Sequence, residues 1–226
     1  MKESKKAILE ILKKNPKKES KFDNLVLNLA LQKVGSDSFD FDGDLVLTAD
    51  RSRLVYCLTD LECVSVPEGV TVIGEMAFKQ KKNLREVIIP DTVREIEKDA
   101  FFDCDNLDNV VIPASVNTIK AYAFAECDNL KTITFKGSPK HLVRNVFSDC
   151  DRLHNIMVPA GCAKAFMKAL HFINEDTDFL IVEEGGEGEA SVKKIAKESK
   201  KERKDKDKKE KKKERKEPVL EETSTK

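Results

Sequence analysis

The chain has 226 residues, with 41 basic and 41 acidic side chains, so its formal net charge is zero. This balance hides an asymmetry, because residues 193–217 hold 15 Lys or Arg against 7 Asp or Glu, whereas residues 1–192 hold 25 against 32. The length allows a sizeable core in an acidic body that carries a basic tail, and no run approaches the roughly 18 apolar residues of a membrane span.

The N-terminal segment lacks the apolar run that is typical of a signal peptide, because Glu10 interrupts residues 7–12. We therefore expect a cytoplasmic or otherwise intracellular protein, in which the six cysteines stay reduced.

Residues 1–35 predict a helical N-terminal arm or cap made of two short helices. Ser4 is a candidate cap for the first helix, which has apolar residues at 7, 8, 11 and 12 and ends before Pro16. Ser20 is a candidate cap for the second, with Gly35 as its stop. The apolar positions of the second helix are Phe22, Leu25, Val26, Leu29 and Leu31. These helices either cover the open end of the fold or form a loose arm, and the alternative is a helix that binds a partner.

Residues 36–63 predict a hairpin cap at the start of the fold. Asp40, Asp42 and Gly43 have the spacing of a calcium loop, but Ala49 stands where a bidentate Glu is needed. We therefore expect a turn over 36–43 and no metal site. Two β-rich runs, 45–48 and 53–57, flank a short polar loop and indicate a hairpin.

The stretch from Val64 to Leu153 repeats with a period of 23 residues. Pro67, Pro90 and Pro113 mark the period, and Pro159 falls two periods later, with Lys136 at the skipped mark. Three further positions keep this phase: a phenylalanine 11 residues after the mark (Phe78, Phe101, Phe124, Phe147), a leucine 17 after it (Leu84, Leu107, Leu130, Leu153), and a cysteine 14 after it (Cys104, Cys127, Cys150, with Lys81 in the first copy). A period of about 20 to 29 residues with leucine and cysteine marks indicates a leucine-rich repeat solenoid over residues 64–158.

Each repeat places a short strand before its proline. In residues 86–90, Val87 and Ile89 share one strand face and are expected to point inward, whereas Glu86 and Ile88 point outward. One repeat cannot bury its apolar face alone, so stacked repeats are expected to form columns of Phe, Ile and Leu.

The repeat closely resembles the BspA-like leucine-rich repeat, with the pattern Leu-x-x-Val-x-Ile-Pro-x-x-Val-x-x-Ile-x-x-x-Ala-Phe-x-x-Cys in residues 84–104. The resemblance covers about 45–183, since 45–57 looks like the usual opening segment and 158–183 like the usual last unit. It implies a non-enzymatic recognition scaffold, often found on bacterial or protist surfaces. It carries over no binding residues.

Residues 159–183 are interpreted as a C-terminal cap repeat, with a helix at 163–172 and a short strand at 179–182. Phe166, Ala169, Leu170 and Ile173 are expected to face the last coil. Residues 184–226 are expected to form a disordered or single-helix charged tail, because they hold little that can be buried. We therefore predict a β-rich α+β fold: a right-handed leucine-rich repeat solenoid with short strands in each repeat, a helical N-terminal arm and a charged C-terminal tail.

Catalysis and cofactor binding have no support in the sequence. The cysteine column allows a disulfide or a thiolate metal site, but repeat-mark cysteines are more often buried structural thiols. His141, His154 and His171 fall at unrelated phases, and there is no Cys-x-x-Cys and no phosphate loop. We expect no enzyme activity, no cofactor, no metal and no small-molecule substrate.

The outward residues of the strands before each proline form the candidate protein-binding surface, here called the pre-proline face. Its central row, two residues before each mark, has three apolar members in five: Ser65, Ile88, Val111, Thr134 and Met157. Its flanking row is Cys63, Glu86, Asn109, Thr132 and Asn155. Exposed apolar surface often marks an interaction site. The apolar row could equally reflect the preference of strands for β-branched residues, or the N-terminal helices could cover it.

The rival function is nucleic-acid or polyanion binding by counterion release through the tail. Its candidate residues are Lys208, Lys209, Lys211, Lys212 and Lys213. The tail has no aromatic residues for stacking bases. A third alternative is a surface adhesin exported by an unrecognised route.

Overall fold

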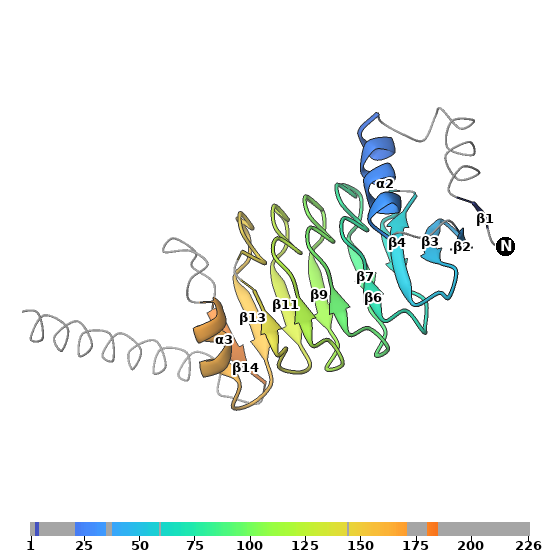
Figure 1. Ribbon diagram of the computed structural model, residues 1–226. Coiled ribbons are helices and arrows are strands. Elements are labelled where there is room, and N and C mark those ends of the chain that lie inside the picture. Colours follow the sequence, from blue (N-terminus) through green and yellow to red (C-terminus); the bar gives the residue numbers. More distant parts are fainter. Residues whose placement is uncertain are drawn as a thin grey trace, which may run out of the picture. The chain divides into compact units, whose positions relative to one another are not determined.

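A computed structural model describes residues 3–4, 21–34, 38–58, 60–143, 145–170 and 180–184 of the protein. The chain divides into two compact units, Met1–Gly185 and Gly186–Lys226, and all the described residues belong to the first. The predicted helix over residues 5–15 and the tail lysines lie outside the described residues. Figure 1 shows the first unit as a row of stacked coils between helices α2 and α3.

The first four coils each contribute two short strands, one on each side of the mark, and the last coil contributes one before its mark. The strands before the marks are β5 (Cys63–Ser65), β7 (Glu86–Ile88), β9 (Asn109–Ile112), β11 (Thr132–Phe135) and β13 (Asn155–Val158). The strands after them are β6 (Val72–Ile73), β8 (Glu95–Ile96), β10 (Thr118–Ile119) and β12 (His141–Leu142). The predicted inward and outward alternation is confirmed in β7, where Val87 is buried and Glu86 and Ile88 are exposed.

The strands of neighbouring coils pair in parallel, one repeat apart in the sequence. The strands after the marks extend a sheet in the order β4-β6-β8-β10-β12, with pairs such as Ile73 and Ile96. The strands before the marks form two pieces, β5-β7 and β9-β11-β13-β14. The coils are therefore a β-solenoid, as the period predicts.

A column of phenylalanines fills the interior. The Phe78 and Phe101 rings stack with centroids 4.8 Å apart, and the Phe101 and Phe124 rings stack at 4.9 Å. Phe147 continues the column at 6.0 Å but is tilted by 30°. Its ring edge also meets Phe135, the aromatic residue that replaces Ile112 of the preceding coil. The predicted stacking of the repeat phenylalanines is confirmed.

Two residues in each coil adopt a left-handed backbone conformation without being glycine. They form two rows at the repeat period: Met76, Asp99, Tyr122 and Asn145, and Gln80, Asp103, Glu126 and Asp149. A positive φ angle brings Cβ close to the following carbonyl, a strain that Asn and Asp tolerate best. These positions bend the chain around the buried phenylalanine, and the repeat pattern did not reveal them.

The N-terminal end corrects two predictions. Residues 38–42, expected as a turn, form strand β2 (Ser38–Asp42), which pairs with β3 (Leu45–Thr48), and β3 pairs with β4 (Arg53–Cys57). The Arg51 guanidinium forms ion pairs with Asp40 and Asp42, which explains the two acidic residues without a metal. Ser4, expected as a helix cap, lies in strand β1 (Glu3–Ser4) and pairs with Ser38.

Helix α2 (Lys21–Lys33) packs against β4. Among the helix side chains that the structure describes, the buried ones are Val26, Leu27, Ala30 and Leu31, which join Tyr56 and Met76 in one apolar cluster. The side chains of Phe22 and Leu25 lie outside the described part. Leu29, one of the apolar positions of the predicted helix, is 39% exposed. Positions 26, 27, 30 and 31 share one helical face, and position 29 points away from it.

The C-terminal end of the coils is covered by α3 (Ala163–Leu170) and β14 (Leu180–Glu183). Phe166 and Leu170 are buried as predicted, Ala169 is half-buried, and Ile173 lies outside the described residues. The Ala163 amide at the start of α3 donates a 2.9 Å hydrogen bond to the Glu183 carboxylate. Within the described parts of the chain, neither helix is long and apolar enough to cross a membrane.

Candidate protein-binding surface

The central row of the pre-proline face crosses the coils in two paired pieces, one on β5 and β7 and one on β9, β11 and β13. Register pairs place Ser65 beside Ile88 and place Thr134 between Val111 and Met157. Ile88 is 51% exposed and Val111 49%, and these are the most exposed large apolar side chains among the described residues. Ser65 is exposed, whereas Thr134 and Met157 are half-buried. The apolar exposure is therefore concentrated on the two middle coils, β7 and β9.

The flanking row lies along the same strands. Glu86 and Asn109 are exposed, and Thr132 and Asn155 are half-buried. Parallel pairing places Asn109, Thr132 and Asn155 side by side on β9, β11 and β13. This polar row can form hydrogen bonds beside the apolar one, which is the usual arrangement at the edge of a protein interface.

The face is interrupted between β7 and β9. These strands are neighbours, but no ladder pair joins them, although β5–β7 and β9–β11 are regularly paired. A groove of about 530 Å³ opens here. Its walls include Arg85, Glu86, Asp108, Asn109, Val111 and Lys131. Nothing in the sequence indicates this groove, because the repeat pattern continues unbroken through it.

A charged row beside the groove was not predicted from the sequence. It runs Glu62, Arg85, Asp108 and Lys131, so the sign of the charge alternates from coil to coil. Within the chain, Arg85 lies 4.0 Å from Glu62 and Lys131 lies 2.8 Å from Asp108. These side chains remain between 43% and 76% exposed. The signal was present in the sequence, since each of them stands five residues before a mark.

Helix α2 does not cover the pre-proline face. It packs on β4, and with Arg53, Val55, Gly74 and Glu97 it lines a pocket of about 200 Å³ on the other sheet. The interpretation that this helix hides the apolar row is therefore wrong for residues 21–34. Residues 5–20 lie outside the described residues.

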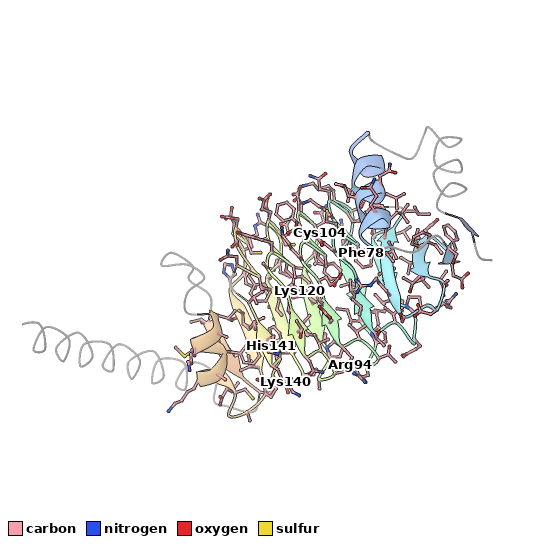
Figure 2. The ribbon with its side chains drawn as sticks, in the orientation of Figure 1. Phe78, Arg94, Cys104, Lys120, Lys140 and His141 are labelled. Carbon is pink, nitrogen blue, oxygen red and sulfur yellow. The ribbon has the colours of Figure 1, made fainter. Side chains whose placement is uncertain are left out.

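The cysteine column is structural. Each thiol donates a hydrogen bond to the phenylalanine carbonyl of the coil before it: Cys104 to Phe78 at 3.1 Å, Cys127 to Phe101 at 3.2 Å and Cys150 to Phe124 at 2.9 Å. Figure 2 labels the first such pair in the body of the coils. Burial raises the pKa of the Cys104 and Cys127 thiols well above the usual pKa range of cysteine. These thiols therefore stay protonated and are poor nucleophiles and metal ligands.

In the first coil a buried lysine replaces the cysteine. Lys81 is 3% exposed, and its Nζ lies 4.8 Å from the centroid of the Tyr56 ring. A cation above an aromatic face is attracted by the ring quadrupole. The substitution therefore joins the first coil to the hairpin strand β4 rather than creating a reactive site.

An ionic cluster lies on the opposite sheet. The Glu97 carboxylate accepts hydrogen bonds from Arg53, from Lys120 at 3.1 Å and from the Glu75 amide at 3.1 Å (Lys120 is labelled in Figure 2). Desolvation by burial favours the neutral acid, but the hydrogen bonds from Arg53 and Lys120 outweigh it and lower the pKa of Glu97. This saturated cluster holds three coils together and has no nucleophile.

The described residues offer no site for a metal: no group of three or more His, Cys, Asp or Glu is placed to hold one. His141 and His154 are exposed, and His171 lies outside the described residues. The tail lysines of the rival hypothesis, Lys208, Lys209, Lys211, Lys212 and Lys213, are also outside the described range, so that hypothesis stays a prediction.

Comparisons with known proteins agree with the repeat. A family model described as the BspA type leucine rich repeat region matches residues 52–172 in six copies. No curated protein matches the chain. Among solved structures, a leucine-rich repeat protein from Eubacterium ventriosum is 19% identical and superposes with a TM-score of 0.50. That match covers 65% of this chain and 48% of the other, so the chain spans about half the length of its structural relative.

Two further solved structures are similar. A leucine rich cell surface protein from Faecalibacterium prausnitzii is 19% identical, with a TM-score of 0.45 over 62% of this chain and 43% of the other. A leucine-rich repeat protein from T. pallidum is 24% identical, with a TM-score of 0.42 over 50% of this chain and 67% of the other. The leucine-rich repeat family and fold are generally those of protein-interaction scaffolds. The family model covers more than half of the sequence, and the chain belongs to the BspA-type leucine-rich repeat family.

Proposed function

We propose that the protein is a non-enzymatic scaffold that binds a protein partner through its pre-proline face, inside the cell. The observation that carries the proposal is the exposure of Ile88 and Val111, about half of each side chain, on the outward side of adjacent strands. An apolar patch rimmed by polar side chains is typical of a protein interaction site.

The rigidity of the coils supports this role. Val87 and Val110, on the inward side of the same strands, are almost completely buried, and the phenylalanine column lies behind them. A surface that is already ordered loses little conformational freedom on binding, so more of the contact energy remains as affinity. Removing apolar area from water contributes roughly 25 cal/mol per Å², which favours contact at the two exposed side chains.

Affinity capture from the native cell tests the proposal. Replacing Ile88→Arg and Val111→Arg together places two charges in the centre of the patch, and we expect the captured partner to disappear. Val143→Arg is the matched control, because Val143 is also an exposed valine, 39% accessible, but follows β12 on the other sheet. The proposal fails if both variants fold with wild-type melting curves and capture the same proteins.

The intracellular location is supported by the state of the cysteines. All six are free thiols, and three of them use their S–H groups as hydrogen-bond donors in the coils. A reducing compartment preserves this state. Labelling intact native cells with a membrane-impermeant reagent tests the location: an unlabelled protein agrees with it, and a labelled protein favours the surface-adhesin alternative.

A further inference from the structure

The alternating charges beside the groove identify a partner for the pre-proline face. We propose that this face binds a second copy of the same chain, packed face to face about a two-fold axis that runs along the strands, midway between β7 and β9. The inference rests on the proposed function of this face and names one occupant for it.

Symmetry fixes which residues meet. A two-fold axis parallel to the strands keeps every row opposite the same row of the second copy but reverses the order of the coils. With the axis between β7 and β9, residues of β7 face β9 of the second copy, and residues of β5 face β11. Ile88 then lies opposite Val111 of the second copy, so the two most exposed apolar side chains cover each other. The two-fold axis produces this contact twice in the dimer.

The charged row is complementary in this arrangement. Arg85 lies opposite Asp108 of the second copy, and Glu62 lies opposite Lys131. Each contact occurs twice, because the interface is symmetric. In the flanking row Glu86 faces Asn109, so no like charges meet among these facing pairs. The exposure of these side chains leaves their outer hydrogen-bonding groups available even though the row is paired within each chain.

The same charges exclude the neighbouring registers. An axis on β9 would place Asp108 opposite its own copy and Arg85 opposite Lys131. An axis on β7 would place Arg85 opposite its own copy and Glu62 opposite Asp108. Like charges brought together in an interface are strongly unfavourable. Opposite charges face each other only when the axis lies midway between two coils, and the axis in the groove is the one that also brings the two most exposed apolar side chains, Ile88 and Val111, together.

The size of the face sets the strength of the contact. The matched face is four strands wide, with about 4.8 Å between strands, and about seven residues long, counting each strand with its flanking residues at about 3.3 Å per residue. It therefore covers on the order of 500 Å² per copy. A stable dimer usually buries about 800 Å² on each partner. We therefore expect a reversible dimer with a dissociation constant in the micromolar range or weaker.

A charge-swap experiment on the full-length chain tests the inference by sedimentation velocity over a wide concentration range. Arg85→Glu alone and Asp108→Arg alone each create like-charge contacts, and each should weaken self-association by about tenfold or more. When the two variants are mixed, the new glutamate of the Arg85→Glu chain faces the new arginine of the Asp108→Arg chain. The unchanged Asp108 of the first chain faces the unchanged Arg85 of the second, so a mixed dimer of about wild-type affinity should form. Arg94→Glu is the matched control, because Arg94 is an exposed arginine next to β8 on the other sheet.

Three results would overturn the inference: a wild-type chain that is monomeric throughout, a dimer that is insensitive to both single variants, or a mixture that does not associate. If either single variant melts below the wild type, the pair Glu62→Lys and Lys131→Glu provides the same test at the outer contacts. If the wild-type chain is monomeric but the double arginine variant still loses its captured partner, this inference is wrong and the proposed function is retained. Unchanged capture in that double arginine variant would instead remove the proposed function.

Discussion

Removing one ring from the phenylalanine column tests whether the stacked coils hold the structure together. Phe101 is completely buried and lies between two parallel rings, 4.8 Å from Phe78 and 4.9 Å from Phe124. Truncating a buried phenylalanine to alanine costs about 3–5 kcal/mol, and each aromatic pair contributes roughly 0.5–1.5 kcal/mol beyond its buried area. Because Phe101→Ala removes two pairs at once, we expect a loss of about 4 kcal/mol in the free energy of unfolding.

The neighbouring residue supplies the control. Phe102 is half-buried on the outside of the same turn, and its ring is contacted by the Lys79 ammonium at 4.2 Å from the centroid. Phe102→Ala should cost only about 1 kcal/mol. Urea unfolding followed by circular dichroism measures both values. Equal losses in the two variants would refute the idea that the column is the main stabilising element.

Three further predictions concern strain, protonation and thiol reactivity. Glu126→Asn should raise the free energy of unfolding by about 0.5–1 kcal/mol in the same urea assay, because Glu126 has a φ angle of 54° that asparagine adopts with less strain; a destabilised variant would argue against the strain. Since the pKa of Glu97 is lower in the folded chain than in the unfolded one, its contribution to stability is present above the ordinary glutamate pKa of about 4.3 and is lost as the pH falls through the folded value. Glu97→Gln should therefore make the free energy of unfolding less dependent on pH below that value, and an unchanged pH dependence would contradict the ion cluster. Iodoacetamide followed by mass spectrometry should modify the exposed Cys63 in the native protein but not the buried Cys104 until urea is added; early modification of Cys104 would contradict its burial.

The sequence was most informative where the repeat imposed a period. The proline marks predicted the strands that precede them, and the phenylalanine 11 residues later predicted the column, because a solenoid must bury the same position in every coil. The outward position of Ile88 followed from strand alternation alone. Such features depend on local spacing, which a sequence displays directly.

Features that depend on three-dimensional detail were not predicted. The strand at 38–42 was hidden by a calcium-like spacing of acidic residues, which form ion pairs with Arg51 in the loop between β3 and β4. The left-handed residues in the coils are of six types, Asp, Asn, Glu, Gln, Met and Tyr, so composition does not mark them. The break between β7 and β9 leaves the repeat unchanged, because it arises from the fit between two coils rather than from any one residue.

Photo-crosslinking in the native cell tests the pre-proline face most directly. A photoreactive amino acid at position 111 stands in the groove between β7 and β9, and the same amino acid at position 94 stands on the other sheet. We predict a specific crosslinked protein, either a separate partner or a second copy of the chain, from position 111 and none of the same mass from position 94. Identical products from both positions, or none from position 111, would contradict the account.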